Sequence, residues 1–139
     1  MTATPTEFFH KTYDETLMLL VEMRDWVAYR QGRERGNGEP SRLNAADRML
    51  VCCESMRVTA RLTHIMAWLL AQKAVYSGEI EPEEAVGEDM PLAGLDVCMD
   101  NGQENHTGFP PQLLQLMDRS YRLYIRVARL DEMVRRRLH

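Results

Sequence analysis

The sequence predicts an all-α fold: one three-helix, up-down-up bundle that forms a homodimer. Three long stretches carry apolar residues at the three-and-four spacing of an α-helix, and no stretch of useful length alternates as a strand does. The middle stretch is apolar on two faces, whereas a surface helix has one such face. Three helices of a 139-residue chain can hardly cover both faces. We therefore expect a second copy to cover one of them.

The first helix is expected from about residue 5 to about residue 31, within a single domain that spans 1–139. Its start is marked by Thr4 as N-cap, Pro5 at the first helical position and Glu7 completing a capping box. A Gly- and Pro-containing loop follows this helix. The expected apolar stripe consists of Phe9, Tyr13, Leu17, Leu20, Met23 or Arg24, and Val27.

The second helix is the longest and is expected from about 41 to about 78, where Gly78 suits a left-handed C-terminal cap. It should supply much of the dimer seam, because it has two apolar stripes. One stripe contains Met49, Cys52, Met56, Thr59, Thr63, Met66 and Leu70. The other contains Val51, Val58, Leu62, Ile65, Leu69 and Tyr76.

An acidic connection joins the second and third helices over residues 79–109. It has nine acidic residues and no Lys or Arg between Glu79 and Glu104, and Pro82 begins a short helix within it. The third helix is expected from about 110 to 137. One of its apolar lines contains Leu113, Leu116, Leu123, Val127, Leu130 and Val134, and the other contains Leu114, Met117, Tyr121, Tyr124 and Ala128.

Composition predicts an ordinary globular protein of the cytoplasm. The net charge is −4, and the longest uncharged apolar run, 62–72, is too short to cross a bilayer. The first residues show no basic start followed by an apolar block, so no signal peptide is expected. Three cysteines, two of them adjacent, do not make a disulfide framework. We expect Cys52 and Cys53 to act as small buried apolar residues.

A polar face on the second helix is the first candidate site. Glu54, Arg57 and Arg61 lie at i, i+3 and i+7, and His64 and Trp68 continue the same face. One interpretation is structural, with an intrahelical Glu–Arg pair or a salt bridge to a neighbouring helix. The other is a polar patch at the dimer seam or at a partner-docking face, where Arg groups bind carboxylates.

A basic stripe on the third helix is the second candidate, because Arg119, Arg122, Arg126 and Arg129 repeat at helical spacing. It is either a solvated face or a surface that the acidic segment 79–104 covers. Nucleic-acid binding is disfavoured, since the chain is acidic and shows no helix-turn-helix spacing.

No catalytic, metal or cofactor site is expected. Glu7 and His10 alone have the Glu-x-x-His spacing of di-metal bundles. Adjacent cysteines point about 100° apart on a helix, so they cannot chelate as a pair. Cys98 and His106 form at most a weak nucleophile pair. Six methionines occupy core-compatible positions: Met18, Met23, Met49, Met56, Met66 and Met117.

Two blocks of the second helix resemble the family of the regulator of CtrA degradation, a domain-of-unknown-function family of alphaproteobacteria. They are 54–62, ESMRVTARL, and 68–75, WLLAQKAV. In the third helix, 120–124 and 126–131 are similar to the family's C-terminal signature. The resemblance implies a cytoplasmic homodimer of three-helix bundles without catalytic activity. It also implies an adaptor that helps deliver cell-cycle substrates to the ClpXP protease.

Two other functions remain open on the residues alone. A small-molecule sensor would need an enclosed pocket near Trp68 and Tyr121. A nucleic-acid-binding regulator would need an unbroken basic surface. The sequence therefore predicts a non-enzymatic scaffold that binds itself and protein partners.

Overall fold

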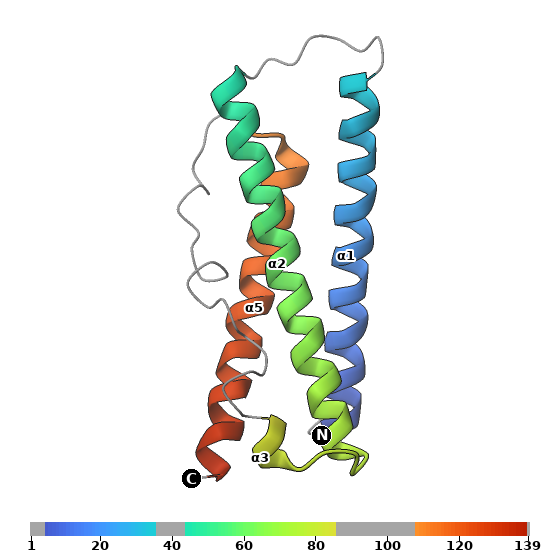
Figure 1. The fold of residues 1–139 in the computed structure, drawn as a ribbon, viewed down its shortest axis with the longest axis vertical. Coiled ribbons are helices and arrows are strands. Elements are labelled where there is room, and N and C mark those ends of the chain that lie inside the picture. The colour runs from blue at the N-terminus through green and yellow to red at the C-terminus, as the bar shows by residue number, and fades with distance from the viewer. Residues whose placement is uncertain (1–4, 36–43, 86–107, 139) are drawn as a thin grey trace.

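A computed structural model describes residues 5–35, 44–85 and 108–138. These ranges form three long helices and one short one (Figure 1) and contain no strand, so they have the all-α class that the sequence predicts. The helices are α1 (Pro5–Arg35), α2 (Ala45–Tyr76), α3 (Pro82–Ala85) and α5 (Pro111–Leu138).

The ends of α2 are set by local hydrogen bonds. Asn44 caps its start, because the side-chain Oδ1 accepts from the backbone N–H of Asp47 at 2.8 Å. At the other end Ser77 is the C-cap, and Gly78 adopts a φ of 81°, the left-handed conformation expected of it. The helix thus begins after the expected start near residue 41, which lies outside the described residues. Helix α1 extends past its expected end to Arg35.

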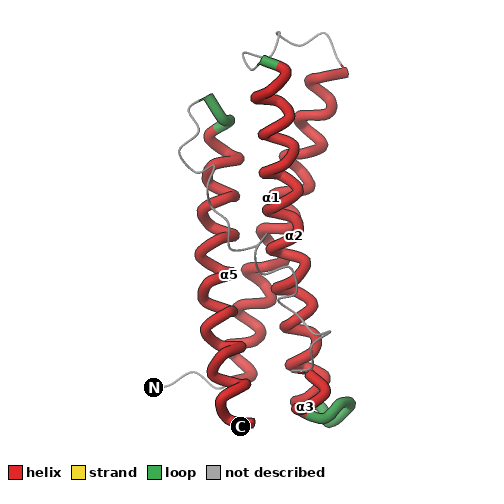
Figure 2. Tube along the Cα trace, turned by 60° about the vertical axis from the view of Figure 1, so that its left-hand side comes forward, coloured by secondary structure: helices red, strands yellow, loops and turns green. Residues whose placement is uncertain are grey.

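The long helices run up-down-down, so the expected up-down-up order is wrong. Arg61 of α2 bonds to Met117 of α5, and Trp68 bonds to Asp131, so residue numbers rise together along the two helices. Ion pairs from α5 to α1 run in opposite directions instead. Helix α5 is therefore parallel to α2 and antiparallel to α1 (Figures 1 and 2). A long connection between α2 and α5 allows this, because parallel neighbours need a crossover rather than a tight turn.

The core fills the space between the three long helices. Its largest part comes from one face of α2 and one face of α5, as their apolar lines predict. The fully packed side chains include Val51, Val58, Leu62, Ile65, Leu69, Leu113, Leu116, Met117, Leu123 and Val127. Burial of such side chains contributes about 1.5–3 kcal/mol each relative to exposure.

The face that α1 turns inward differs from the expected stripe. Its buried residues are Thr12, Thr16, Leu19, Met23 and Trp26. Tyr13 and Leu17 of the expected stripe are exposed instead. The rest of the expected stripe is confirmed, because Met23 is buried and Phe9, Leu20 and Val27 pack against the core. The interpretation was wrong at Tyr13 and Leu17, and it gave no weight to the threonines. Thr16 satisfies its hydroxyl within the helix by donating to the Thr12 carbonyl at 2.7 Å.

The second apolar stripe of α2 lies on the outside of the chain. Met49, Met56 and Leu70 are exposed, and so are Cys52 and Cys53, which corrects the expectation of buried cysteines. Met18 is exposed as well, whereas Met23 and Met117 are core residues as expected. Apolar residues at helical spacing indicate a helix face that is buried. The spacing does not show whether the same chain or another molecule buries that face.

Candidate functional site

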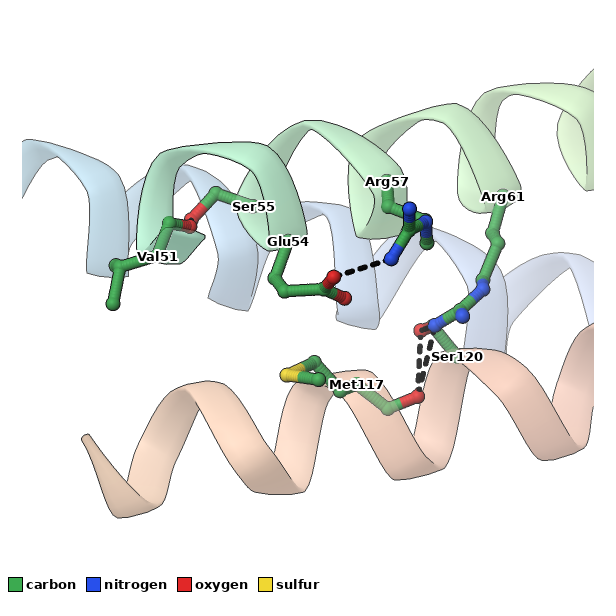
Figure 3. Close-up of polar contacts among 7 residues, drawn as sticks. All are labelled: Val51, Glu54, Ser55, Arg57, Arg61, Met117 and Ser120. Carbon is green, nitrogen blue, oxygen red and sulfur yellow. Dashed lines mark hydrogen bonds and ion pairs between the residues drawn. The ribbon is translucent and has the colours of Figure 1, made fainter. Parts of the chain in front are cut away.

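The polar face of α2 points mainly into its own bundle (Figure 3). Glu54, Arg61 and Trp68 are buried, while Arg57 and His64 are partly buried. Arg61 and Trp68 bond to α5, and Glu54 pairs with Arg57 on the same flank of α2. This arrangement matches the interhelical interpretation of the face more closely than the docking one.

Arg61 is the centre of this contact. Its side chain is fully buried, and Nη1 donates to the Met117 carbonyl and to the Ser120 hydroxyl, both at 3.2 Å. The Ser120 hydroxyl in turn donates to the Met117 carbonyl at 3.1 Å. The guanidinium also lies 5.3 Å from the centre of the Tyr121 ring, within cation–π range. A buried arginine is tolerated because neutral oxygens and a ring replace its water shell.

Two further contacts continue this line. Upstream, Arg57 pairs with the buried carboxylate of Glu54; the other oxygen of that carboxylate, Oε2, has no hydrogen-bond partner among the described residues. Downstream, the Trp68 indole donates to Asp131 at 3.0 Å, and Arg135 donates to the other oxygen of Asp131 at 2.9 Å. We call the set Glu54, Arg57, Arg61, Trp68, Ser120 and Asp131 the polar seam.

The α5 half of the polar seam was not predicted from the sequence. Ser120 and Asp131 lie on apolar lines of α5 and are buried. A small or charged residue that interrupts such a line was the available signal, because buried polar groups are nearly always hydrogen-bonded.

The basic stripe of α5 lies along α1. Arg119 pairs with Glu22 at 2.6 Å, and Arg126 pairs with Glu15 at 3.0 Å. Two members of the stripe thus bridge to α1 rather than to the acidic segment, which lies largely outside the described residues.

The other two arginines of the stripe face outward. Arg122 pairs within α5 with Asp118, and Arg129 is exposed. A surface hollow of about 560 Å³ lies beside the stripe. It is lined by Glu15, Arg119, Tyr121, Arg122, Ile125, Arg126 and Arg129.

Another flank of the bundle, made by α1 and α2, carries exposed and partly buried apolar side chains. A hollow of about 410 Å³ runs along it and includes Leu20, Val27 and Thr59. Leu17 and Leu70 are exposed on the same two helices, and Met66 is partly exposed. We call the set Leu17, Leu20, Val27, Thr59, Thr63, Met66 and Leu70 the α1–α2 face.

The remaining sequence candidates give no catalytic arrangement in the part of the chain that the structure describes. Glu7 and His10 are both exposed on α1, and Cys98 and His106 lie outside the described residues. Within 5–35, 44–85 and 108–138, no group of three or more His, Cys, Asp or Glu side chains could hold a metal ion. No helix in those ranges combines the length and apolar character of a membrane span. Trp68 is packed in the core and lines neither surface hollow.

Comparison with known proteins agrees with this architecture. A family model described as "Protein of unknown function (DUF1465)" matches residues 1–139. Among solved structures, RcdA from Caulobacter crescentus CB15 is similar, with 30% sequence identity and a TM-score of 0.66 over 91% of this chain and 89% of that chain. No curated protein matches the sequence. The chain therefore belongs to the DUF1465 family and is similar in sequence and fold to RcdA.

Proposed function

We propose that this protein is a non-enzymatic regulatory adaptor that acts as a homodimer and helps deliver protein substrates to the ClpXP protease. The observation that carries the proposal is the likeness to RcdA, at 30% identity over 91% of the chain. The same function is implied by the resemblance of segments 54–62, 68–75, 120–124 and 126–131 to the family. The described residues supply what an adaptor needs, which is a rigid helical scaffold with more than one exposed surface.

The homodimer rests on the α1–α2 face. Leu17 is 45% exposed and Leu70 51% exposed, and apolar residues that gather on one surface are typical of an interaction site. Thr59 and Thr63 lie between the larger side chains and leave room for another helix to approach. Both threonine hydroxyls donate to carbonyls of their own helix, at 2.9 and 2.7 Å. They can therefore be covered without losing a hydrogen bond.

Light scattering tests the homodimer. The wild-type protein should show twice the chain mass of 16.1 kDa. Leu70→Glu should reduce this to the monomer, because a second copy would have to bury the new charge. Met133→Glu is the matched control, since Met133 is an equally exposed apolar residue on α5 away from this face. A wild-type monomer at micromolar concentration, or a Leu70→Glu dimer, contradicts this seam.

The basic stripe of α5 is the proposed surface for protein partners of the protease system. Arg122 and Arg129 are exposed, and among the described residues neither forms an ion pair with α1 that substitution would remove. Arginine is enriched in protein interfaces because its planar group binds carboxylates through two hydrogen bonds. The dimer seam and the stripe use different flanks of the bundle, so both can be occupied at once.

A binding assay with purified ClpX, with and without a ClpXP substrate, tests this surface. Arg122→Glu combined with Arg129→Glu should weaken capture of the partner while the dimer and the helical content stay unchanged. Arg136→Glu serves as control, because Arg136 is an exposed arginine of α5 that, among the described residues, pairs with Glu132 one turn away. Equal capture by all three proteins would remove the stripe from the proposal. Absence of any ClpX or substrate binding by the wild type would overturn the adaptor function itself.

A further inference from the structure

Four sulfur-bearing side chains share one exposed surface near the start of α2. They are Met49, Cys52, Cys53 and Met56, and all four are exposed. Met49 is 66% exposed and Met56 71%, which is unusual for a residue that normally fills gaps in cores. None of the four belongs to the polar seam or to the basic stripe.

Helix geometry brings these side chains together. Met49 lies three residues before Cys52 and four before Cys53. Met56 lies four residues after Cys52 and three after Cys53. Residues at these spacings have Cβ atoms about 5–6 Å apart on the helix surface. Met49, Cys52 and Met56 fall within roughly 60° of one another around the helix axis, at 100° per residue. The adjacent cysteines diverge, so one thiol and two thioethers form the tightest group.

We propose that this group binds one soft metal ion of the Cu(I) type. Cys52 would lose its thiol proton to solvent and form a thiolate–metal bond, and the sulfurs of Met49 and Met56 would donate to the same ion. No oxidation or reduction is involved. Thiolate and thioether sulfur together select Cu(I), whereas structural zinc sites use four cysteine, histidine or carboxylate ligands.

The surroundings of the group favour a soft ion over a hard one. Ala45, Ala60 and the exposed Arg48 flank the four sulfurs on the same side of the helix, and none of the three offers an oxygen ligand from its side chain. The closest carboxylate in the α2 sequence, Glu54, is buried on the opposite side, where it pairs with Arg57. Ca²⁺ and Mg²⁺ require several oxygen ligands, and the described residues place no carboxylate on this surface.

The site is complete within one chain. It lies N-terminal along α2 to Thr59, where the α1–α2 face begins, and it shares no residue with that face. Both sets lie on the same stripe of α2, so the metal titration and the dimer mass are measured on the same variants to tell the two properties apart.

The experiment is an anaerobic titration of the full-length protein with Cu(I), in ascorbate, against the chromophoric chelator bicinchoninate. The wild type should withdraw about one Cu(I) per chain from the chelator. Because the thiol must be deprotonated, the apparent affinity should fall as the pH is lowered. Met49→Leu combined with Met56→Leu should weaken binding by roughly tenfold or more, since a lost ligand costs at least as much as a lost supporting hydrogen bond. Cys52→Ser should weaken it further.

Two controls make the result specific. Leucine conserves the apolar volume of methionine, so the double variant should keep the wild-type circular dichroism and dimer mass. Met133→Leu and Cys98→Ser change a sulfur outside the proposed ligand set and should bind Cu(I) as the wild type does. The proposal is overturned if the double methionine variant competes as well as the wild type, or if Cys98→Ser abolishes binding. It is equally overturned if the wild type fails to compete with the chelator.

Discussion

Helix α2 has two apolar faces with nearly the same apolar content. The inner face is buried in the bundle, and the outer face is exposed to solvent. The inner face packs Val58, Leu62 and Ile65 against the other helices and joins its polar atoms to α5. The outer face leaves Met56 and Leu70 exposed. The inner face therefore determines the fold of the single chain, and the outer face is available for binding.

The polar seam differs from ordinary core packing in what it specifies. Apolar side chains tolerate a shift of one helix along another more easily than directional hydrogen bonds do. Arg61 bonded to Met117 and Trp68 bonded to Asp131 fix the register of two parallel helices at two points. Buried polar groups have this registry role in other helical assemblies. We infer that the seam selects the parallel arrangement of α2 and α5 more than it adds stability.

The largest expected effect is at Arg61. Arg61→Ala should lower the free energy of unfolding by about 3–5 kcal/mol, because it opens a cavity and removes the donor that Met117 and Ser120 share. Arg61→Met should recover most of this loss, since it fills the space without burying a charge. Urea unfolding followed by far-ultraviolet circular dichroism measures both. A loss below about 1 kcal/mol in the alanine variant would mean that the guanidinium is not buried as the structure has it.

Truncations on the two faces of α2 compare them directly. Leu62→Ala on the inner face should cost about 2–5 kcal/mol, because Leu62 is fully buried. Met56→Ala on the outer face should change stability by about 0.5 kcal/mol or less in the monomer. Thermal or urea unfolding at two protein concentrations provides the measurement. If the Met56→Ala loss grew with protein concentration, a second copy would also cover the start of α2.

Substitution of Trp68, the tryptophan of the polar seam, should lower the free energy of unfolding by an intermediate amount. Trp68→Phe keeps an aromatic ring but removes the donor to Asp131, and a hydrogen bond to a charged group is worth about 1.5–3 kcal/mol. Trp26→Phe is the matched control, because Trp26 is buried on α1 and its indole nitrogen makes no hydrogen bond to the described residues. The difference between the two losses in urea unfolding isolates the Trp68–Asp131 bond. Equal losses would show that ring volume alone accounts for the effect.

Much of this fold is readable from the sequence, because helical periodicity reports on burial. The apolar lines of α5 and the inner stripe of α2 predict the core. Gly78 marks the end of α2. The same signal failed for α1, where Thr12 and Thr16 replace apolar residues in the core. Periodicity alone could not separate the inner from the outer stripe of α2, since both have the same spacing.

Helix direction was the main feature that the sequence analysis assigned wrongly. A three-helix chain with short loops alternates direction, but a long connection permits either order. Ser120 and Asp131 carried part of the missing information, because they are the polar residues of α5 that meet Arg61 and Trp68 in parallel order. For the candidate site, the sequence singled out the polar face of α2, but it could not show that α5 receives the side chain of Arg61.

The smallest expected effect concerns the α1–α5 contact, which is held by exposed ion pairs. A double-mutant cycle of Glu22→Gln and Arg119→Gln should give a coupling energy below about 1 kcal/mol, because both side chains are substantially exposed. The coupling should shrink further in 0.5 M salt, since screening acts on exposed charges. Urea unfolding of the four proteins at two salt concentrations measures it. If the coupling energy were as large as the unfolding free energy lost in Arg61→Ala, the α1–α5 ion pairs would be as important for the fold as the polar seam. A small coupling would leave Arg119 free to exchange Glu22 for a carboxylate of a partner, which would extend the proposed docking surface beyond Arg122 and Arg129.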